Sequence, residues 1–60
     1  MSERRELKIA LALIKRHCAK LAVIMETTTS ARIFQRAEYE FRREQNRAEE
    51  IRLQLAQLID

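Results

Sequence analysis

Three side chains capable of chemistry lie inside long stretches of mixed polar and apolar residues: His17, Cys18 and Glu44. His17 and Cys18 are neighbours and are the only histidine and cysteine in the chain. Neighbouring residues on an α-helix point about 100° apart, so these two side chains cannot hold a metal ion from one helical face. They also fall short of the four ligands that a structural zinc site needs. We therefore expect neither a metal nor a cofactor.

Each of these residues has a structural and a functional interpretation. His17 fits a neutral histidine at the edge of a core, bonded to a partner such as a glutamate; the alternative is a pH-sensitive residue or a metal ligand. Cys18 fits a small apolar core residue, because a reactive thiol needs exposure and a positive environment. Glu44 interrupts an apolar stripe, where a polar residue can fix the register of packed helices. Its partner could be His17, Arg16 or a second chain, or the stripe could be loose and hydrated at this point.

A basic ridge runs along the second half of the chain. If that segment is helical, the four members of the ridge project within about 60° of one another over about 22 Å of helix axis. They are Arg32, Arg36, Arg43 and Arg47. Tyr39 lies near the edge of the ridge and could stack on an unpaired base, while the arginines follow a phosphate backbone. Glu40 and Glu50 flank the ridge, and ion pairs at a spacing of four are typical of a solvated helix surface. The ridge is therefore either a nucleic-acid-binding surface or a solvated, protein-contacting face.

The sequence lacks the elements of a catalytic site. It has no glycine for a phosphate-binding loop. The chain has a single histidine, and most of its hydroxyl side chains stand together in the segment 27–30, away from that histidine in the sequence. No Ser-His-Asp arrangement is therefore indicated. Glutamate pairs occur at helical spacing, but nothing indicates the apolar cavity that would make them acid–base catalysts. We expect no enzymatic activity and no small-molecule substrate.

The elements that must position these residues are two helices. The 60 residues contain no glycine and no proline, 47% are apolar and 35% are charged. This composition is typical of long helices and coiled coils and disfavours sheets and tight turns. The one break in the helical pattern is the segment 27–30, because threonine and serine are poor inside helices and good as N-caps. The sequence predicts one domain over 1–60, with helices over about 3–26 and 31–59 and a turn at 27–30. The alternative is one continuous helix through the threonines.

Both helices have an apolar stripe at alternating spacings of three and four residues. The stripe is Leu7, Leu11, Ile14, Cys18, Leu21 and Met25 in the first helix, and Phe34, Ala37, Phe41, Glu44, Ala48, Ile51, Leu55 and Leu58 in the second. This is the a/d pattern of a coiled coil. Because the break between the helices is short, we expect an all-α, coiled-coil-like antiparallel hairpin with the two stripes packed together.

The first helix is apolar over too much of its circumference for a single neighbour. Its apolar arc spans about 220°, against about 120° in the second helix and roughly 100° for one packing face. The simplest solution is a second copy of the chain, which gives a homodimeric four-helix bundle. The residues expected in the oligomer or partner interface are Leu7, Ile9, Leu13, Ile14, His17, Leu21, Ile24, Phe41, Ile51, Leu55 and Leu58.

These features favour a small protein–protein interaction module, such as a self-associating adaptor, co-chaperone or inhibitor that binds a larger protein. The alternative is a four-helix-bundle dimer that binds RNA or DNA through the basic ridge, in line with a formal net charge of +3. No apolar stretch reaches the roughly 20 residues that span a bilayer, so we expect no membrane partner. A single cysteine suits a reducing compartment, and we expect a cytoplasmic location.

Overall fold

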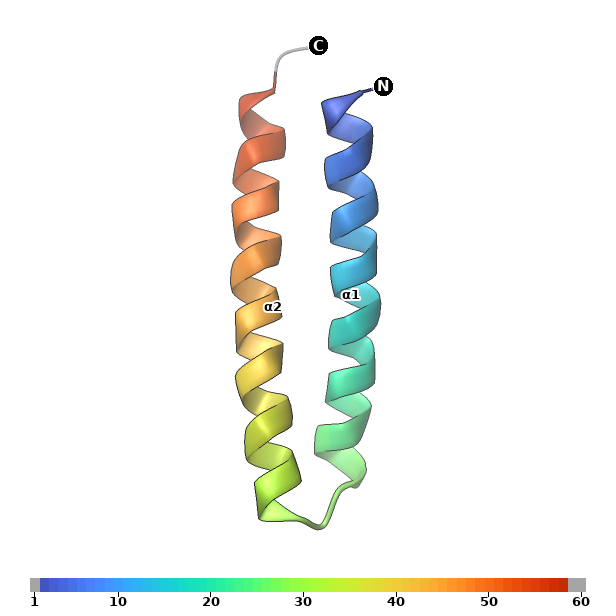
Figure 1. Cartoon of the computed structure of the whole chain (residues 1–60), viewed down its shortest axis with the longest axis vertical. Coiled ribbons are helices and arrows are strands. Elements are labelled where there is room, and N and C mark those ends of the chain that lie inside the picture. The colour runs from blue at the N-terminus through green and yellow to red at the C-terminus, as the bar shows by residue number, and fades with distance from the viewer. Residues whose placement is uncertain (1, 59–60) are drawn as a thin grey trace.

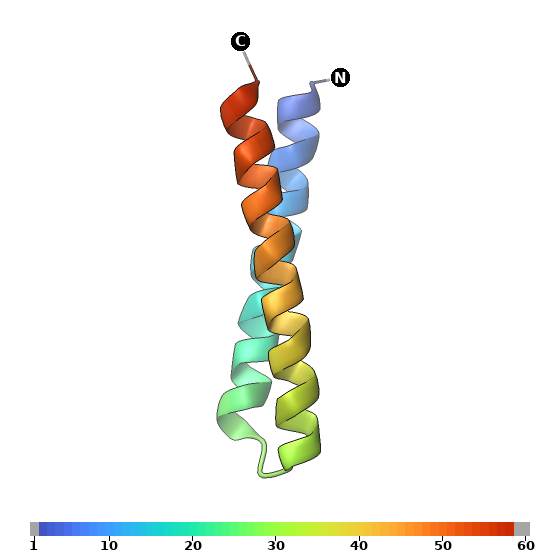
Figure 2. The ribbon, with the colours of Figure 1, turned by 90° about the vertical axis from the view of Figure 1, so that its left-hand side faces the viewer.

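The chain folds as a two-helix hairpin (Figure 1). The computed structural model describes residues 2–58, in which α1 covers Glu3–Thr27 and α2 covers Ala31–Gln57. The helices run antiparallel, so the start of α1 and the end of α2 lie at the same end of the molecule. In the perpendicular view they cross one another (Figure 2), as packed helices do when side-chain ridges fit into grooves. The predicted all-α hairpin is confirmed, and the continuous helix is excluded.

The turn between the helices is stabilised by its own hydroxyl groups. Thr28 Oγ1 accepts a hydrogen bond from the backbone N–H of Ser30 at 3.1 Å, and Ser30 Oγ accepts one from the N–H of Ile33 at 3.3 Å. Ser30 is therefore the N-cap of α2 and satisfies a donor that has no partner inside the helix. At the end of α1, Thr27 Oγ1 donates to the carbonyl oxygen of Val23 at 2.8 Å. The hydroxyl residues that disfavour a continuous helix are thus the ones that form the turn.

The helix bounds lie close to those expected from the sequence. α1 ends at Thr27, one residue later than predicted, and α2 begins at Ala31. α2 ends at Gln57, and Ile59, the predicted end, lies outside the described residues. With 25 and 27 residues, the two helices are nearly equal in length.

The two apolar stripes form the seam between α1 and α2. Every stripe residue is buried or half-buried except Phe34, near the start of α2. Among the described residues, the buried ones are Ile14 and Leu21 of α1 and Ala37 and Ala48 of α2. Two helices cannot surround a side chain on all sides, so the core of a single hairpin is thin.

The hairpin is a rod with a large surface for its mass. It measures 47 × 15 × 13 Å, and its radius of gyration of 14.1 Å exceeds the value of about 10 Å for a compact 60-residue domain. Its accessible surface is 5209 Å². A compact monomer of 7.2 kDa exposes roughly 4,100 Å², so the hairpin has a surplus of about 1,100 Å². This surplus is comparable to the area, about 800 Å², that one partner buries in an ordinary protein interface.

Candidate interaction surface

The seam leaves a groove on each side of the hairpin. On one side, here named the open side, two hollows adjoin at Glu40. The first is lined by Leu21, Ile24, Ile33, Arg36, Ala37 and Glu40, and the second by His17, Glu40, Arg43, Glu44 and Arg47. The opposite groove, here named the polar side, is lined by Ile14, Lys15, Cys18, Gln45, Ala48, Glu49 and Arg52. The two sides differ in what they offer to a partner.

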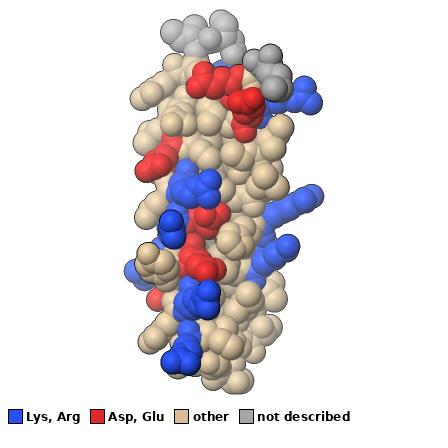
Figure 3. Space-filling model, viewed as in Figure 1, with Lys and Arg blue, Asp and Glu red and all other residues tan. Residues whose placement is uncertain are grey.

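Large apolar side chains lie uncovered on the open side. Ile24 and Ile33 are 40% and 50% exposed although they border the seam. Leu13 is 59% exposed. It lies on the same flank of α1 as His17 and Ile24, because it precedes His17 by one helical turn and Ile24 follows His17 by two turns. Figure 3 looks onto the open side and shows uncharged surface beside a column of charged side chains along α2. Burying a side chain of this kind contributes about 1.5–3 kcal/mol, so exposure of this surface to water is unfavourable.

The polar side offers little comparable apolar surface. Its rims are formed by Lys15 of α1 and by Gln45, Glu49 and Arg52 of α2. Arg52 Nη1 lies 3.6 Å from Glu49 Oε2, an ion pair at a spacing of three that is typical of a hydrated helix surface. The hairpin thus has one side suited to packing and one suited to water.

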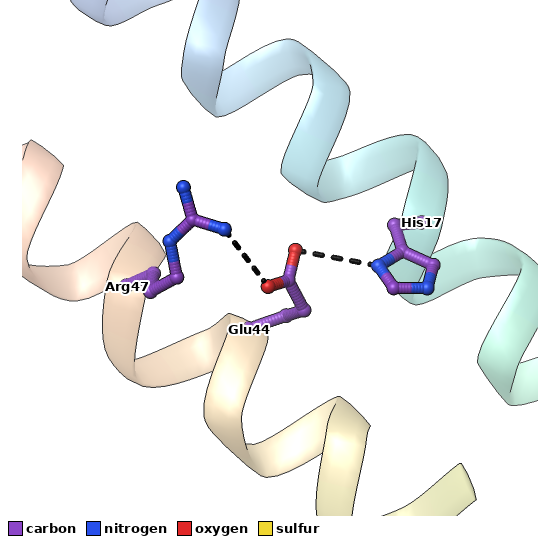
Figure 4. Close-up of polar contacts among 3 residues, drawn as sticks. All are labelled: His17, Glu44 and Arg47. Atoms are coloured by element: carbon purple, nitrogen blue, oxygen red, sulfur yellow. Dashed lines mark hydrogen bonds and ion pairs between the residues drawn. The ribbon is translucent and has the colours of Figure 1, made fainter.

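A polar cluster lies halfway along the open side (Figure 4). His17 Nδ1 is 3.4 Å from Glu44 Oε2, and Arg47 Nη1 donates a hydrogen bond to Glu44 Oε1 at 3.2 Å. The Glu44 side chain is 13% exposed, whereas that of His17 is 49% exposed. A carboxylate at such a position needs partners because burying it alone is costly. Glu44 therefore has one partner on each helix, His17 on α1 and Arg47 on α2. Of His17 and Arg16, the two partners that the sequence offers within the chain, His17 is the one in contact with Glu44.

Three of the four arginines of the basic ridge, Arg36, Arg43 and Arg47, line the open side along α2, whereas Arg32 lies on the outer surface of this helix, seven residues before Tyr39. Two members of the ridge pair with glutamates of the same helix: Arg36 Nε lies 3.7 Å from Glu40 Oε1, and Arg47 Nη1 lies 3.2 Å from Glu44 Oε1. The other two arginines of the ridge form no ion pair with a residue in the described range 2–58. Positive and negative side chains follow one another along α2 in Figure 3. The ridge is therefore part of a ladder of alternating charge and not a uniformly basic strip.

Cys18 lies in the seam and is half-buried. Desolvation by burial, together with the negative charge of Glu44, raises the pKa of the Cys18 thiol above its ordinary value. The thiol is therefore held in its neutral, unreactive form near neutral pH. This environment fits a packing role for the side chain.

The residues expected in an oligomer or partner interface fall into three groups. Seven lie in the seam and pack within the hairpin: Leu7, Ile14, Leu21, Phe41, Ile51, Leu55 and Leu58. His17 and Ile24 line the open side, and Leu13 lies on the same flank of α1, one helical turn before His17. The last, Ile9, is exposed on the outer surface of α1, where it shares a row with Val23, an exposed residue fourteen positions further on that was not among the expected ones.

Two features of the open side were not expected from the sequence. Ile33 and Glu40 were not among the candidate site residues, and the apolar flank of α1 was not expected to share a side with the basic ridge of α2. The signal lay in the coiled-coil register, because residues directly preceding an a position face one another along one side of an antiparallel pair. His17 and Ile24 hold such positions in α1, as Ile33 and Glu40 do in α2. Tyr39, the proposed base-stacking residue, is exposed one residue before Glu40, in the outer row of α2.

Comparison with known protein families, curated proteins and solved structures finds no match to this chain. Over the described part of the chain, no group of three or more His, Cys, Asp or Glu side chains could hold a metal ion. Neither α1 nor α2, as far as they are described, combines the length and the apolar character needed to cross a bilayer. The open side is the feature on which a function can be based.

Proposed function

We propose that this protein is a non-enzymatic helical interaction module that self-associates, with two hairpins packing their open sides together as a four-helix bundle. The observation that supports this proposal is the exposure of Leu13, Ile24 and Ile33 on one side of the rod. Large aliphatic side chains that gather at the border of a core are typical of a protein contact. Each helix of a four-helix bundle packs against two neighbours, and each helix of this hairpin has one.

The surface area supports the same conclusion. The surplus of about 1,100 Å² per chain exceeds the area of about 800 Å² that each partner contributes to an ordinary interface. The small number of buried side chains points the same way, since a chain of this length is marginally stable alone. Self-association provides the missing burial without a disulfide or a metal.

The assembled module would act as an adaptor, co-chaperone or inhibitor that binds a larger protein. Its outer surfaces remain available for that contact, and they include the exposed side chains of Val23, Tyr39 and Leu53. A cytoplasmic location is part of the proposal, because a lone thiol such as Cys18 suits a reducing compartment.

A matched pair of substitutions tests the proposal. Ile24 and Val23 are adjacent, exposed and β-branched, but only Ile24 lies on the open side. We expect Ile24→Asp to sediment as a monomer at concentrations where Val23→Asp keeps the mass of a dimer. Circular dichroism of both variants shows whether helicity is lost together with the dimer. If the unmodified chain and both variants share the mass of a monomer, the proposal is wrong.

A dimer that binds nucleic acid is the second candidate, because the Arg36 side chain is 83% exposed in the hairpin. The interspersed glutamates weigh against it, since they repel phosphate. Binding of mixed-sequence RNA and DNA at low and moderate salt separates the candidates. A steep loss of affinity with salt, abolished by Arg36→Glu with Arg43→Glu, would support the nucleic-acid candidate. Absence of binding at low salt would remove it.

A further inference from the structure

We infer that the second copy packs antiparallel to the first, about a twofold axis at the level of His17 and Glu44. This inference rests on the proposed self-association and adds its geometry. The two turns then lie at opposite ends of the bundle, α1 packs on α1 of the other copy, and α2 packs on α2. The support comes from two patterns of residues on the open side that share one centre.

The first pattern is the charge ladder of α2. Arg36 and Glu50 lie seven residues on either side of Arg43, and Glu40 and Arg47 are equidistant from the midpoint between Arg43 and Glu44. The members of each pair have opposite charges. When α2 packs antiparallel to its own copy about this centre, Arg36 meets Glu50 and Arg47 meets Glu40, twice each. With both turns at the same end, a twofold axis would instead pack α1 on α2 of the other copy, and neither set of charge pairs could form.

The second pattern is the apolar flank of α1. Ala10 and Ile24 lie seven residues on either side of His17. An antiparallel copy of α1 centred there places the large Ile24 side chain against the small Ala10 side chain, as close packing of helices requires. Leu13 then lies against Lys20, whose aliphatic chain can cover the leucine while its ammonium group stays in water.

The two centres coincide in the folded hairpin. His17 Nδ1 is 3.4 Å from Glu44 Oε2, so the centre of the α1 pattern lies directly beside the centre of the α2 pattern (Figure 4). The register of α1 against α2 is set by the seam and the turn. It does not depend on the residues of the open side that form the two patterns. One twofold axis therefore satisfies both patterns at once, which is the juxtaposition on which the inference rests.

The packing gives each part of the open side a separate role. Around the axis, the two copies form a polar layer that contains His17, Glu40, Arg43, Glu44 and Arg47 from each chain. The two Arg43 side chains approach each other there, and the four glutamates of the layer balance the four arginines. Apolar contacts on either side of the layer provide affinity, while the layer fixes register and direction, as polar residues do in coiled coils.

Disulfide cross-linking of the full chain tests this geometry in a Cys18→Ala background. Positions 10 and 24 of one chain are about 21 Å apart along the helix, far beyond the Cα separation of about 7 Å that a disulfide can bridge. We therefore expect Ala10→Cys alone and Ile24→Cys alone to stay uncross-linked under mild oxidation. An equal mixture of the two variants should give a covalent dimer, and His17→Cys alone should also do so because position 17 lies at the axis.

Leu53→Cys, an exposed position in the outer row of α2, measures cross-linking by random collision. Sedimentation of the Cys18→Ala chain tells the possible failures apart. Suppose that this chain is a dimer, but the mixture of Ala10→Cys and Ile24→Cys gives no more covalent dimer than Leu53→Cys or than Ala10→Cys alone. The antiparallel packing is then wrong and self-association stands. If the chain is a monomer at every concentration and no variant exceeds the background, self-association and its geometry are both wrong.

Discussion

His17 Nδ1 and Glu44 Oε2 lie 3.4 Å apart near the mid-length of both helices, and they form a polar contact across the apolar seam. A polar contact at a core position lowers stability compared with an apolar one and restricts the ways in which helices can align. Substitutions at Glu44 should therefore change stability and specificity in opposite directions.

Glu44→Leu should stabilise the hairpin and make its assembly less specific. The substitution completes the apolar seam, and we expect a gain of about 1–2 kcal/mol in the free energy of unfolding. His17 and Arg47 lose their partner but are exposed enough to be hydrated. Urea unfolding should show a higher midpoint, and sedimentation should show more than one oligomer. A lower midpoint with a single dimeric species would contradict this role of Glu44.

Leu21→Asp should unfold the hairpin and its dimer together. Leu21 is among the buried side chains of the seam, where a carboxylate would be desolvated without a partner. We expect a loss of at least about 3 kcal/mol, as for removal of a buried leucine side chain, measured by thermal unfolding followed by circular dichroism. Val23→Asp, in the outer row of the same helix, is the control and should keep its helicity. A helical, folded monomer with Leu21→Asp would show that the seam does not hold the helices together.

Charge reversal on the open side should produce two chains that associate with each other better than with themselves. One chain has Arg36→Glu and Arg47→Glu, and the other has Glu40→Arg and Glu50→Arg. In the antiparallel packing, each chain alone places like charges opposite one another, whereas the mixed pair restores four ion pairs. Native mass spectrometry of the mixture should therefore show mainly the heterodimer.

Two chains with opposite net charges attract each other wherever the charges lie. A control pair of variants therefore changes the same number of charges on the polar side. One control chain has Arg42→Glu and Arg52→Glu, and the other has Glu38→Arg and Glu49→Arg. Their net charges change by the same amounts as in the first set, and each control chain loses two intrahelical ion pairs. These chains should each keep forming homodimers, and their mixture should show no stronger preference for the heterodimer than chance and general attraction provide. An equal preference in both sets would argue against charge pairing across the open sides.

Cys18 should react slowly with iodoacetamide at neutral pH. Burial and the charge of Glu44 raise the pKa of its thiol, so the reactive thiolate forms only at a pH above the ordinary range. Glu44→Gln removes the second of these causes and should increase the alkylation rate at a fixed, mildly alkaline pH. Glu38→Gln, a neutral change elsewhere on α2, should leave the rate unchanged. A rate that is insensitive to Glu44→Gln would show that the two side chains do not interact.

The same raised pKa predicts a pH dependence of stability. The folded chain holds the Cys18 proton more tightly than the unfolded chain, whose thiol has its ordinary pKa of 9.0. The contribution of this group to stability is therefore complete below the unfolded pKa and is lost as the pH rises through the folded pKa. Urea unfolding of the original chain and of Cys18→Ala, compared at neutral and alkaline pH, should show the extra loss only with the thiol present. Parallel pH profiles for the two chains would contradict the raised pKa.

The hairpin itself could be predicted because it follows from local rules. The spacing from Leu7 to Met25 predicts a helix with one packing row, and the hydroxyl residues from Thr27 to Ser30 predict where it ends. The choice of Ser30 as the N-cap could not be made beforehand, because three hydroxyl residues in sequence could each take that place and the backbone of the turn decides among them.

The composition of the open side was harder to anticipate because it depends on two helices at once. Whether His17 or Arg16 meets Glu44 is decided by the register of α1 against α2, which a turn longer or shorter by one residue would change. The sequence also gives the widths of the apolar arcs without saying which flank the partner helix covers. α2 leaves Ile24 and Leu13 open and places the basic ridge beside them.

Sedimentation equilibrium of the unmodified chain over a wide concentration range decides whether two hairpins pack together. We expect a mass of twice 7.2 kDa at high concentration, with dimer and helicity lost together on dilution. A helical species of 7.2 kDa at every concentration, with Leu13 and Ile24 in contact with water, would contradict this expectation.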